Sequence, residues 1–176
     1  MNKINVKEII RPTLALFTIC IAAALALSLS NLATSDKIAE NEQNTLSEAM
    51  RQVLSADEYT QVKTDIADGD TALYKASGPS GTVGYTALCT KTGYGGKIKV
   101  MVGINNDGTV KKVAIISADD ETPGLGQNVK TDDFLSRFEG ASNASGVDAW
   151  TGATISSTAV KGAVNEALEL YNQYKE

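Results

Sequence analysis

The 176-residue chain contains no histidine, and this absence excludes several kinds of site. Without imidazole there is no Ser-His-Asp or Cys-His catalysis, no His-ligated haem and no HExxH zinc site. The two cysteines, Cys20 and Cys89, are too few to ligate an iron-sulfur cluster or an all-cysteine zinc site. Demanding chemistry must therefore come from carboxylates, hydroxyls or a bound cofactor. We assign no catalytic residue and no metal ligand.

The chain is also poor in basic residues. Sixteen Lys and Arg against 21 Asp and Glu give a net charge of −5, and the first 35 residues are themselves basic, so the remainder is more acidic than the whole. An acidic domain repels the phosphates of nucleic acids, so we expect no nucleic-acid partner. The charged fraction of 21% and the hydrophobic fraction of 43% are typical of a globular protein.

An uncharged stretch near the N-terminus predicts a membrane anchor. No charge occurs between Arg11 and Asp36, and residues 13–33 read TLALFTICIAAALALSLSNLA. As a helix these residues span about 31 Å, which matches a bilayer core of about 30 Å. The positive-inside rule predicts a single pass through the cell membrane, with residues 1–12 in the cytoplasm and the acidic part outside. The alternative is a cleaved signal peptide, but no clean small-x-small site follows the apolar run.

The rest of the chain predicts a polar tether over residues 34–44 and one extracytoplasmic domain over residues 45–176. Thr45–Glu48 matches a capping box and predicts a helix start. Alternating patterns predict strands, of which 97–104 reads as half-buried, and turns are predicted at 68–70, 77–81 and the hairpin signal 105–108. Strands and helices are segregated, so we expect an α+β fold with antiparallel strands and a long C-terminal helix. The predicted strands are 71–76, 82–90, 97–104 and 110–117, and the later helices are 131–138, capped by Thr131, and 156–174.

The stretch Asp148–Thr154, which reads DAWTGAT, carries the most chemical information. A hydroxyl-rich turn with a glycine runs directly into the last predicted helix. The first N–H groups of a helix lack partners and its macrodipole adds positive charge, so this is a potential anion site. Gly152 and Ala153 leave space for a phosphate, and hydroxyls are offered by Thr151, Thr154, Ser156 and Ser157. The plainer alternative is a helix start capped by Ser or Thr.

The pattern Asp-x-x-Thr-Gly-Ala-Thr resembles the acceptor motif recognised by flavin transferases. In that family the last hydroxyl residue receives FMN through a phosphoester bond, and here it is Thr154. The loop Glu121–Gly126 (ETPGLG) is similar to one in the FMN-binding domain of the Rnf complex G subunit and the related C subunit of the sodium-pumping NADH:quinone reductase. The N-terminal anchor, the Gly93–Gly96 turn and the following hairpin come in the same order as in those two proteins. The resemblance covers nearly the whole chain, and the short length is closer to the Rnf protein.

The resemblance implies roles for individual residues. Thr154 is the expected FMN phosphoryl threonine, in a loop shaped by Thr151, Gly152 and Ala153. Asp148 is the expected recognition residue for the transferase, and its plainer alternative is a capping or turn aspartate. The residues expected to lie against the flavin, or else to form a plain turn, are Glu121, Thr122, Gly124 and Leu125. Further candidates are Tyr94 and Trp150 for the ring, and Lys97 and Lys99 for the phosphate, although a solvated strand face is the plainer reading of the lysines.

The implied function is an electron-relay subunit with covalently attached FMN. It would belong to a membrane complex that couples ferredoxin:NAD electron transfer to the export of Na+ or H+. Expected partners are a second flavinylated membrane subunit, an iron-sulfur-bearing membrane pair and a flavin transferase for maturation. Three alternatives stay open: a C-type subunit of the sodium-pumping NADH:quinone reductase, a standalone flavinylated surface protein, and a non-redox anchored binding domain.

Overall fold

The computed structural model describes residues 6–65 and 71–175. The chain divides into two compact units, Met1–Asn44 and Thr45–Glu176, and each is considered by itself. Helix α1 (Val6–Val53) runs through the first unit and ends in the second, which holds all the other elements. The turn predicted at residues 68–70 lies outside the described residues.

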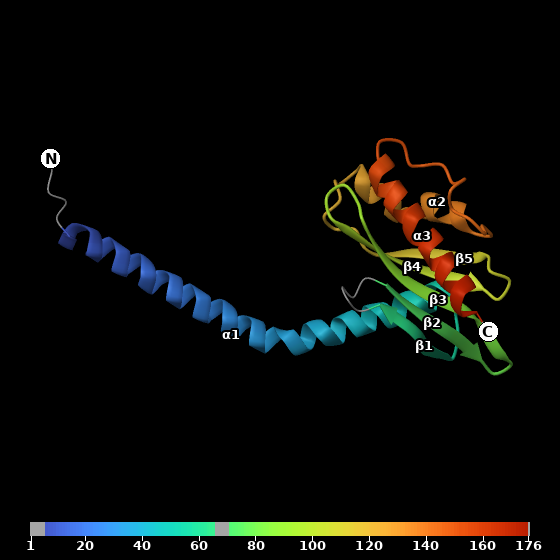
Figure 1. The fold of residues 1–176 in the computed structure, drawn as a ribbon, viewed down its shortest axis with the longest axis horizontal. Coiled ribbons are helices and arrows are strands. Elements are labelled where there is room, and N and C mark those ends of the chain that lie inside the picture. Colours follow the sequence, from blue (N-terminus) through green and yellow to red (C-terminus); the bar gives the residue numbers. More distant parts are fainter. Residues whose placement is uncertain (1–5, 66–70, 176) are drawn as a thin grey trace. The chain divides into compact units, whose positions relative to one another are not determined.

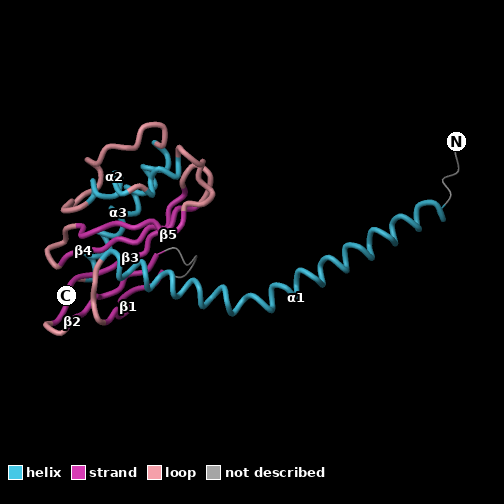
Figure 2. Tube along the Cα trace, turned by 180° about the vertical axis from the view of Figure 1, so that it is seen from behind, coloured by secondary structure: helices cyan, strands magenta, loops and turns pink. Residues whose placement is uncertain are grey.

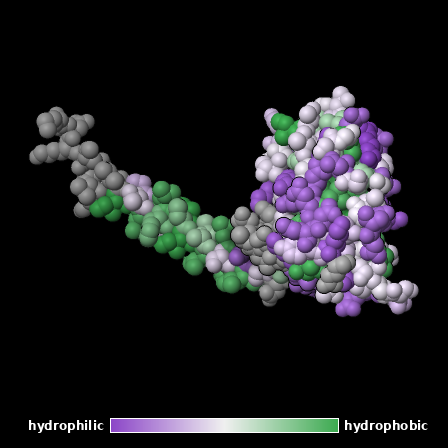
Figure 3. Space-filling view, turned by 45° about the vertical axis from the view of Figure 1, so that its right-hand side comes forward, coloured by the Kyte–Doolittle hydropathy of each residue, from purple (hydrophilic) through white to green (hydrophobic). Residues whose placement is uncertain are grey.

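Helix α1 contains one segment, Ile10–Ser35, that is long and apolar enough to cross a membrane, and it is not buried in the protein. Figure 3 shows apolar side chains gathered along this part of the helix. The polar residues 34–44 are helical as well, so the helix start predicted at Thr45 is wrong. Because residues 34–45 contain no proline or glycine, extending the existing helix costs less than nucleating a new one. The role of residues 34–44 as a tether stays a prediction.

Five antiparallel strands form one sheet in sequence order, as Figures 1 and 2 show. The strand predictions are confirmed, and the Asn105–Gly108 hairpin closes with a bond from the Gly108 N–H to the Asn105 carbonyl at 3.0 Å. The edge strand β1 is additional, since no sequence pattern singles it out. The strands are β1 (Glu58–Asp65), β2 (Thr71–Gly78), β3 (Gly81–Thr92), β4 (Lys97–Asn105) and β5 (Val110–Ser117).

Both faces of the sheet are covered. Helix α3 (Thr154–Tyr174), red in Figure 1, packs on one face through an apolar stripe that includes Val160 and Val164. The last turns of α1 pack on the other face through Met50 and Val53. Because successive side chains of a strand point to opposite faces, β4 sends alternate residues into each layer. The half-buried strand predicted at 97–104 is therefore wrong, since β4 is buried on both sides.

Three short helical segments connect β5 to the loop before α3. They are η1 (Gly126–Lys130), α2 (Asp132–Leu135) and η2 (Ser136–Phe138), and they add Val129, Phe134 and Phe138 to the core beneath α3. The helix predicted at 131–138 is thus one α-helical turn followed by a 3-10 turn. Thr131 precedes α2 but does not cap it, because its hydroxyl donates instead to the Asn128 carbonyl at 2.7 Å.

Gly103→Ala tests whether the end of α1 packs on β4 as described. A Cβ at Gly103 would lie 2.5 Å from the carbonyl oxygen of Val53. Because a backbone atom cannot move aside, we expect the free energy of unfolding to fall by about 1–3 kcal/mol. Gly146→Ala is the matched control: its Cβ meets nothing within 4 Å, so we expect a change below about 0.5 kcal/mol. Urea unfolding of the full chain in detergent, followed by circular dichroism, measures both, and equal stabilities would contradict the described packing.

Candidate functional site

Three segments that are distant in the sequence line one hollow of about 480 Å³. They are the β3–β4 turn with Tyr94, the loop that follows β5, and the start of α3. The volume lies within the range of small-molecule sites. The lining residues are Tyr94, Glu121, Thr122, Leu125, Gly126, Gly152, Ala153, Thr154, Ile155 and Ser156.

Helix α3 begins in this hollow without a side-chain cap. Its N-cap residue is Ala153, one of the least suitable residues at that position, and Thr154 is its first residue. Gly152 adopts a φ of +82°, which turns the chain into the helix. The capped-helix alternative is therefore wrong. The side chain of Thr154 is exposed, next to the partial positive charge of the helix end, which favours an anion there.

The other hydroxyls predicted for an anion are arranged differently. Ser156 donates its hydroxyl hydrogen to Oε2 of Glu121. The hydroxyl oxygen of Ser157 accepts the backbone N–H of Trp150 at 3.0 Å. Thr151 is exposed but does not line the hollow. Among these hydroxyls only Thr154 is both exposed and part of the lining.

Glu121 is a buried carboxylate, with 2% of its surface exposed. Its oxygens accept the Ser156 hydroxyl and the Gly95 N–H, the latter at 3.0 Å. Burial raises the pKa of Glu121, but the hydrogen bonds from Ser156 and from the N–H groups of Gly95, Gly96 and Tyr94 outweigh it and hold the pKa below its usual value. The side chain is therefore ionised at neutral pH, and it is the one charged residue among the described residues that line the hollow.

Large apolar side chains surround the mouth of the hollow. Tyr94 is 72% exposed, Leu125 50% and Ile155 54%. Three such side chains around one hollow indicate a binding surface rather than scattered exposure. Ile155 is absent from the sequence prediction, because only the folded helix start shows that its side chain points outward.

Several predicted residues lie apart from this lining. Trp150 is partly buried beside the core, with the Arg137 guanidinium 5.3 Å from its ring centre, so it does not line the hollow as a ring contact would. Asp148 and Gly124 are exposed and do not line the hollow either. Lys97, which is exposed, and Lys99, which is partly buried, lie on β4 and do not line the hollow.

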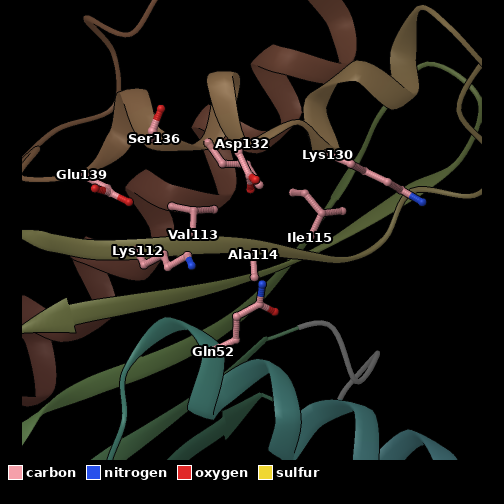
Figure 4. Close-up of a pocket in the computed structure, with 10 residues that line it drawn as sticks. Gln52, Lys112, Val113, Ala114, Ile115, Lys130, Asp132, Ser136 and Glu139 are labelled. Atoms are coloured by element: carbon pink, nitrogen blue, oxygen red, sulfur yellow. The ribbon is translucent and has the colours of Figure 1, made fainter.

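A second hollow, of about 270 Å³, lies along β5 and is shown in Figure 4. Lys112 and Ile115 of β5 face Asp132 and Glu139 across it. Lys130 on its rim pairs with Asp119 at 2.7 Å. It contains none of the residues that the sequence singles out, so the first hollow is the candidate site.

The comparisons with known proteins agree with this choice. The FMN-binding domain family matches residues 93–169, a range that includes the whole lining. The G subunit of the proton-translocating ferredoxin:NAD(+) oxidoreductase complex of Clostridium ljungdahlii is 31% identical over 85% of this chain and 84% of its own length. The chain belongs to the G-subunit family of ion-translocating oxidoreductase complexes.

Other relatives extend the comparison. The G subunit of the Na(+)-translocating ferredoxin:NAD(+) oxidoreductase complex of Acetobacterium woodii is 30% identical over 96% of this chain and 94% of its own length. The solved C subunit of the Na(+)-translocating NADH-quinone reductase of Parabacteroides distasonis shares the fold, with a TM-score of 0.54. It is 19% identical and covers 68% of this chain and 77% of that one. The family assignment favours the G-type protein over the C-type alternative.

The buried charge of Glu121 predicts a specific pH dependence of stability. Because its folded-state pKa is lowered, its contribution is complete above the unfolded value of about 4.3 and is lost as the pH falls through the folded-state value. At pH 7 we expect Glu121→Gln to lower the free energy of unfolding by about 1–3 kcal/mol. The gap to the unmodified chain should begin to narrow as the pH falls through the unfolded value, and it should go on narrowing until the folded-state carboxyl is protonated.

Urea unfolding of the full chain at intervals from pH 7 to pH 3 measures this gap. Asp132→Asn, which neutralises an exposed carboxylate on α2, is the control and should leave the curve of the unmodified chain nearly unchanged. A gap that stays constant down to pH 3 would show that the charge of Glu121 does not stabilise the fold.

Proposed function

We propose that this chain carries FMN on the hydroxyl of Thr154 through a phosphoester bond. It serves as an electron-relay subunit of a membrane complex that couples ferredoxin:NAD electron transfer to ion export. The observation that carries the proposal is the uncapped start of α3, where Thr154 is exposed inside a hollow with an apolar rim. The family assignment and the FMN-binding domain match support it.

The start of α3 suits a phosphodiester. The phosphate of such a linkage carries one negative charge, and the described lining offers no lysine or arginine to balance it. The free N–H groups and the macrodipole of the helix end supply the positive potential instead. Thr151, Gly152 and Ala153 form the turn that leads to the acceptor, and we propose exposed Asp148 as the residue read by the flavin transferase.

The apolar rim suits the flat face of an isoalloxazine ring. Leu125 and Thr122 line one side of the hollow, and Tyr94 and Ile155 come from the two other segments. Gly124 lies in the same loop as Leu125. FMN, when attached, supplies the redox chemistry, and the chain holds the ring in place and shields part of it from water. An FMN attached to Thr154 through its phosphate would leave its ring free to approach a neighbouring redox centre.

The first unit supports a membrane location. We infer that residues 13–33, within the apolar segment Ile10–Ser35, span the membrane, with residues 1–12 in the cytoplasm. Residues 34–44 then form a helical tether, and residues 45–176 lie on the extracytoplasmic face. Partners are a second flavinylated membrane subunit and an iron-sulfur-bearing membrane pair. The two G-type relatives are named for proton and sodium translocation respectively, and we propose H+ or Na+ as the exported ion.

The covalent linkage is tested by Thr154→Ala. In the unmodified chain, purified from native membranes, we expect an intact mass higher by FMN less one water, and fragmentation should place the increment on Thr154. Thr154→Ala should lack the increment and keep its fold, since an exposed threonine at a helix start contributes about 1 kcal/mol or less. Thr158→Ala, one turn further along the same exposed face, is the control and should retain the flavin. An unmodified Thr154 in native membranes, or flavin retained by Thr154→Ala, contradicts the proposal.

A further inference from the structure

The carboxylate of Glu121 joins the three segments that form the hollow. It belongs to the loop after β5, one oxygen accepts the Gly95 N–H of the β3–β4 turn, and the other accepts the hydroxyl of Ser156 in the first turn of α3. The apolar rim residues Tyr94 and Ile155 are direct neighbours of these two donors in the sequence. One side chain therefore connects every wall of the site.

The surrounding backbone is fitted closely around this side chain. A Cβ at Gly126 would lie 2.5 Å from Oε2 of Glu121 and 3.0 Å from the hydroxyl oxygen of Ser156. A Cβ at Gly95 would collide with the carbonyl oxygen of Asp120, the residue before Glu121. Gly95 and Gly126 therefore leave room for the Glu121 carboxylate and its hydrogen-bond donors to lie close together. A larger residue at either position would push them apart.

The hydrogen-bond donors around Glu121 favour a charged acceptor. The groups aimed at the two oxygens are N–H donors and the hydroxyl of Ser156. A glutamine would fit the same volume but would carry no charge, and its NH2 group could be satisfied only if the Ser156 hydroxyl turned round to accept from it. The negative charge also lies at the positive end of α3, which begins without a side-chain cap and has no acidic residue in its first turn.

We propose that Glu121 is a positioning residue: its buried carboxylate fixes the start of α3, and with it the hydroxyl of Thr154, against the β3–β4 turn and the loop that carries Leu125. This inference rests on the proposed function of Thr154 as the FMN acceptor. Glu121 lines the hollow with only 2% of its surface exposed. In the proposed site it acts through Ser156 and Gly95, and not as a contact of the flavin. Covalent attachment needs Thr154 held in one place, and small displacements of a reacting group reduce rates steeply.

The first test is local and needs no flavin. Amide hydrogen exchange is measured on the full chain in detergent, expressed without a flavin transferase, for Glu121→Gln and Ser156→Ala. We expect the amides of residues 93–96 and of the first turn of α3 to exchange at least about tenfold faster in Glu121→Gln, because a hydrogen bond to a charged group is lost. Ser156→Ala removes only the hydrogen bond to the start of α3. It should therefore raise the exchange rate there more than in the β3–β4 turn.

Two control variants separate this role from general destabilisation. Val164→Ala removes buried volume from α3 on the core side and should raise exchange across the sheet without selecting the turn. Asp119→Asn removes an exposed charge two residues from Glu121 that is paired with Lys130, and it should leave exchange in residues 93–96 unchanged. If Glu121→Gln shows the same exchange pattern as Val164→Ala, the carboxylate is merely part of the core and the proposal is overturned.

The second test is the attachment itself. Each variant is co-expressed with a flavin transferase, and the fraction of chains bearing the FMN increment is followed by intact mass over time. We expect the rate of attachment to fall at least about tenfold in Glu121→Gln, with Val164→Ala and Asp119→Asn close to the unmodified chain. Normal attachment in Glu121→Gln, with the unmodified chain fully loaded, overturns the positioning role alone. No attachment in the unmodified chain overturns the proposed function, and the exchange experiment still decides whether the carboxylate holds the three segments.

Discussion

The candidate site depends on a buried carboxylate that accepts a hydrogen bond at each of its oxygens. Removing a charge from water costs several kcal/mol, which is recovered only when the charge is well hydrogen-bonded. Glu121 meets this condition because the Gly95 N–H of the β3–β4 turn donates to one oxygen and the Ser156 hydroxyl donates to the other. Each wall of the hollow therefore helps to keep the carboxylate ionised, and the ionised carboxylate holds the walls together.

The sheet supports this arrangement because it is buried on both faces. Strand β4 contributes one set of side chains to the layer beneath α3 and the other to the layer beneath the end of α1. The helix that contains the apolar segment Ile10–Ser35 thus also supplies part of the core of the second unit. Because β3 and β4 are fixed in this way, the turn between them holds its N–H groups in place to donate to Glu121.

Patterns that depend on local sequence predicted the structure well. Alternation and the Asn-Gly-type hairpin signal located four strands, and the C-terminal helix predicted at 156–174 is α3. Two of the failures involve long-range contacts, whereas the missing cap at Thr131 is local. Strand β1 reads EYTQVKTD, largely polar, and is recognisable only through its pairing with β2. Thr131 has the residue type of a cap, but its hydroxyl donates to the Asn128 carbonyl instead of accepting a helix N–H. Likewise the composition around Thr154 indicated an anion site, whereas the engagement of Ser156 by a residue 35 positions away is visible only in the fold.

The β3–β4 turn has a consequence for how this protein can vary over evolution. A Cβ at Gly95 would collide with the backbone of Asp120, and a Cβ at Gly96 would collide with the Asp120 side chain. Tyr94, between Gly93 and Gly95, is 72% exposed. Positions that determine the fold and a position that faces outward are therefore interleaved within four residues. Natural substitutions at residue 94 can change what this surface contacts at almost no cost to folding. Substitutions of the neighbouring glycines would destabilise the fold.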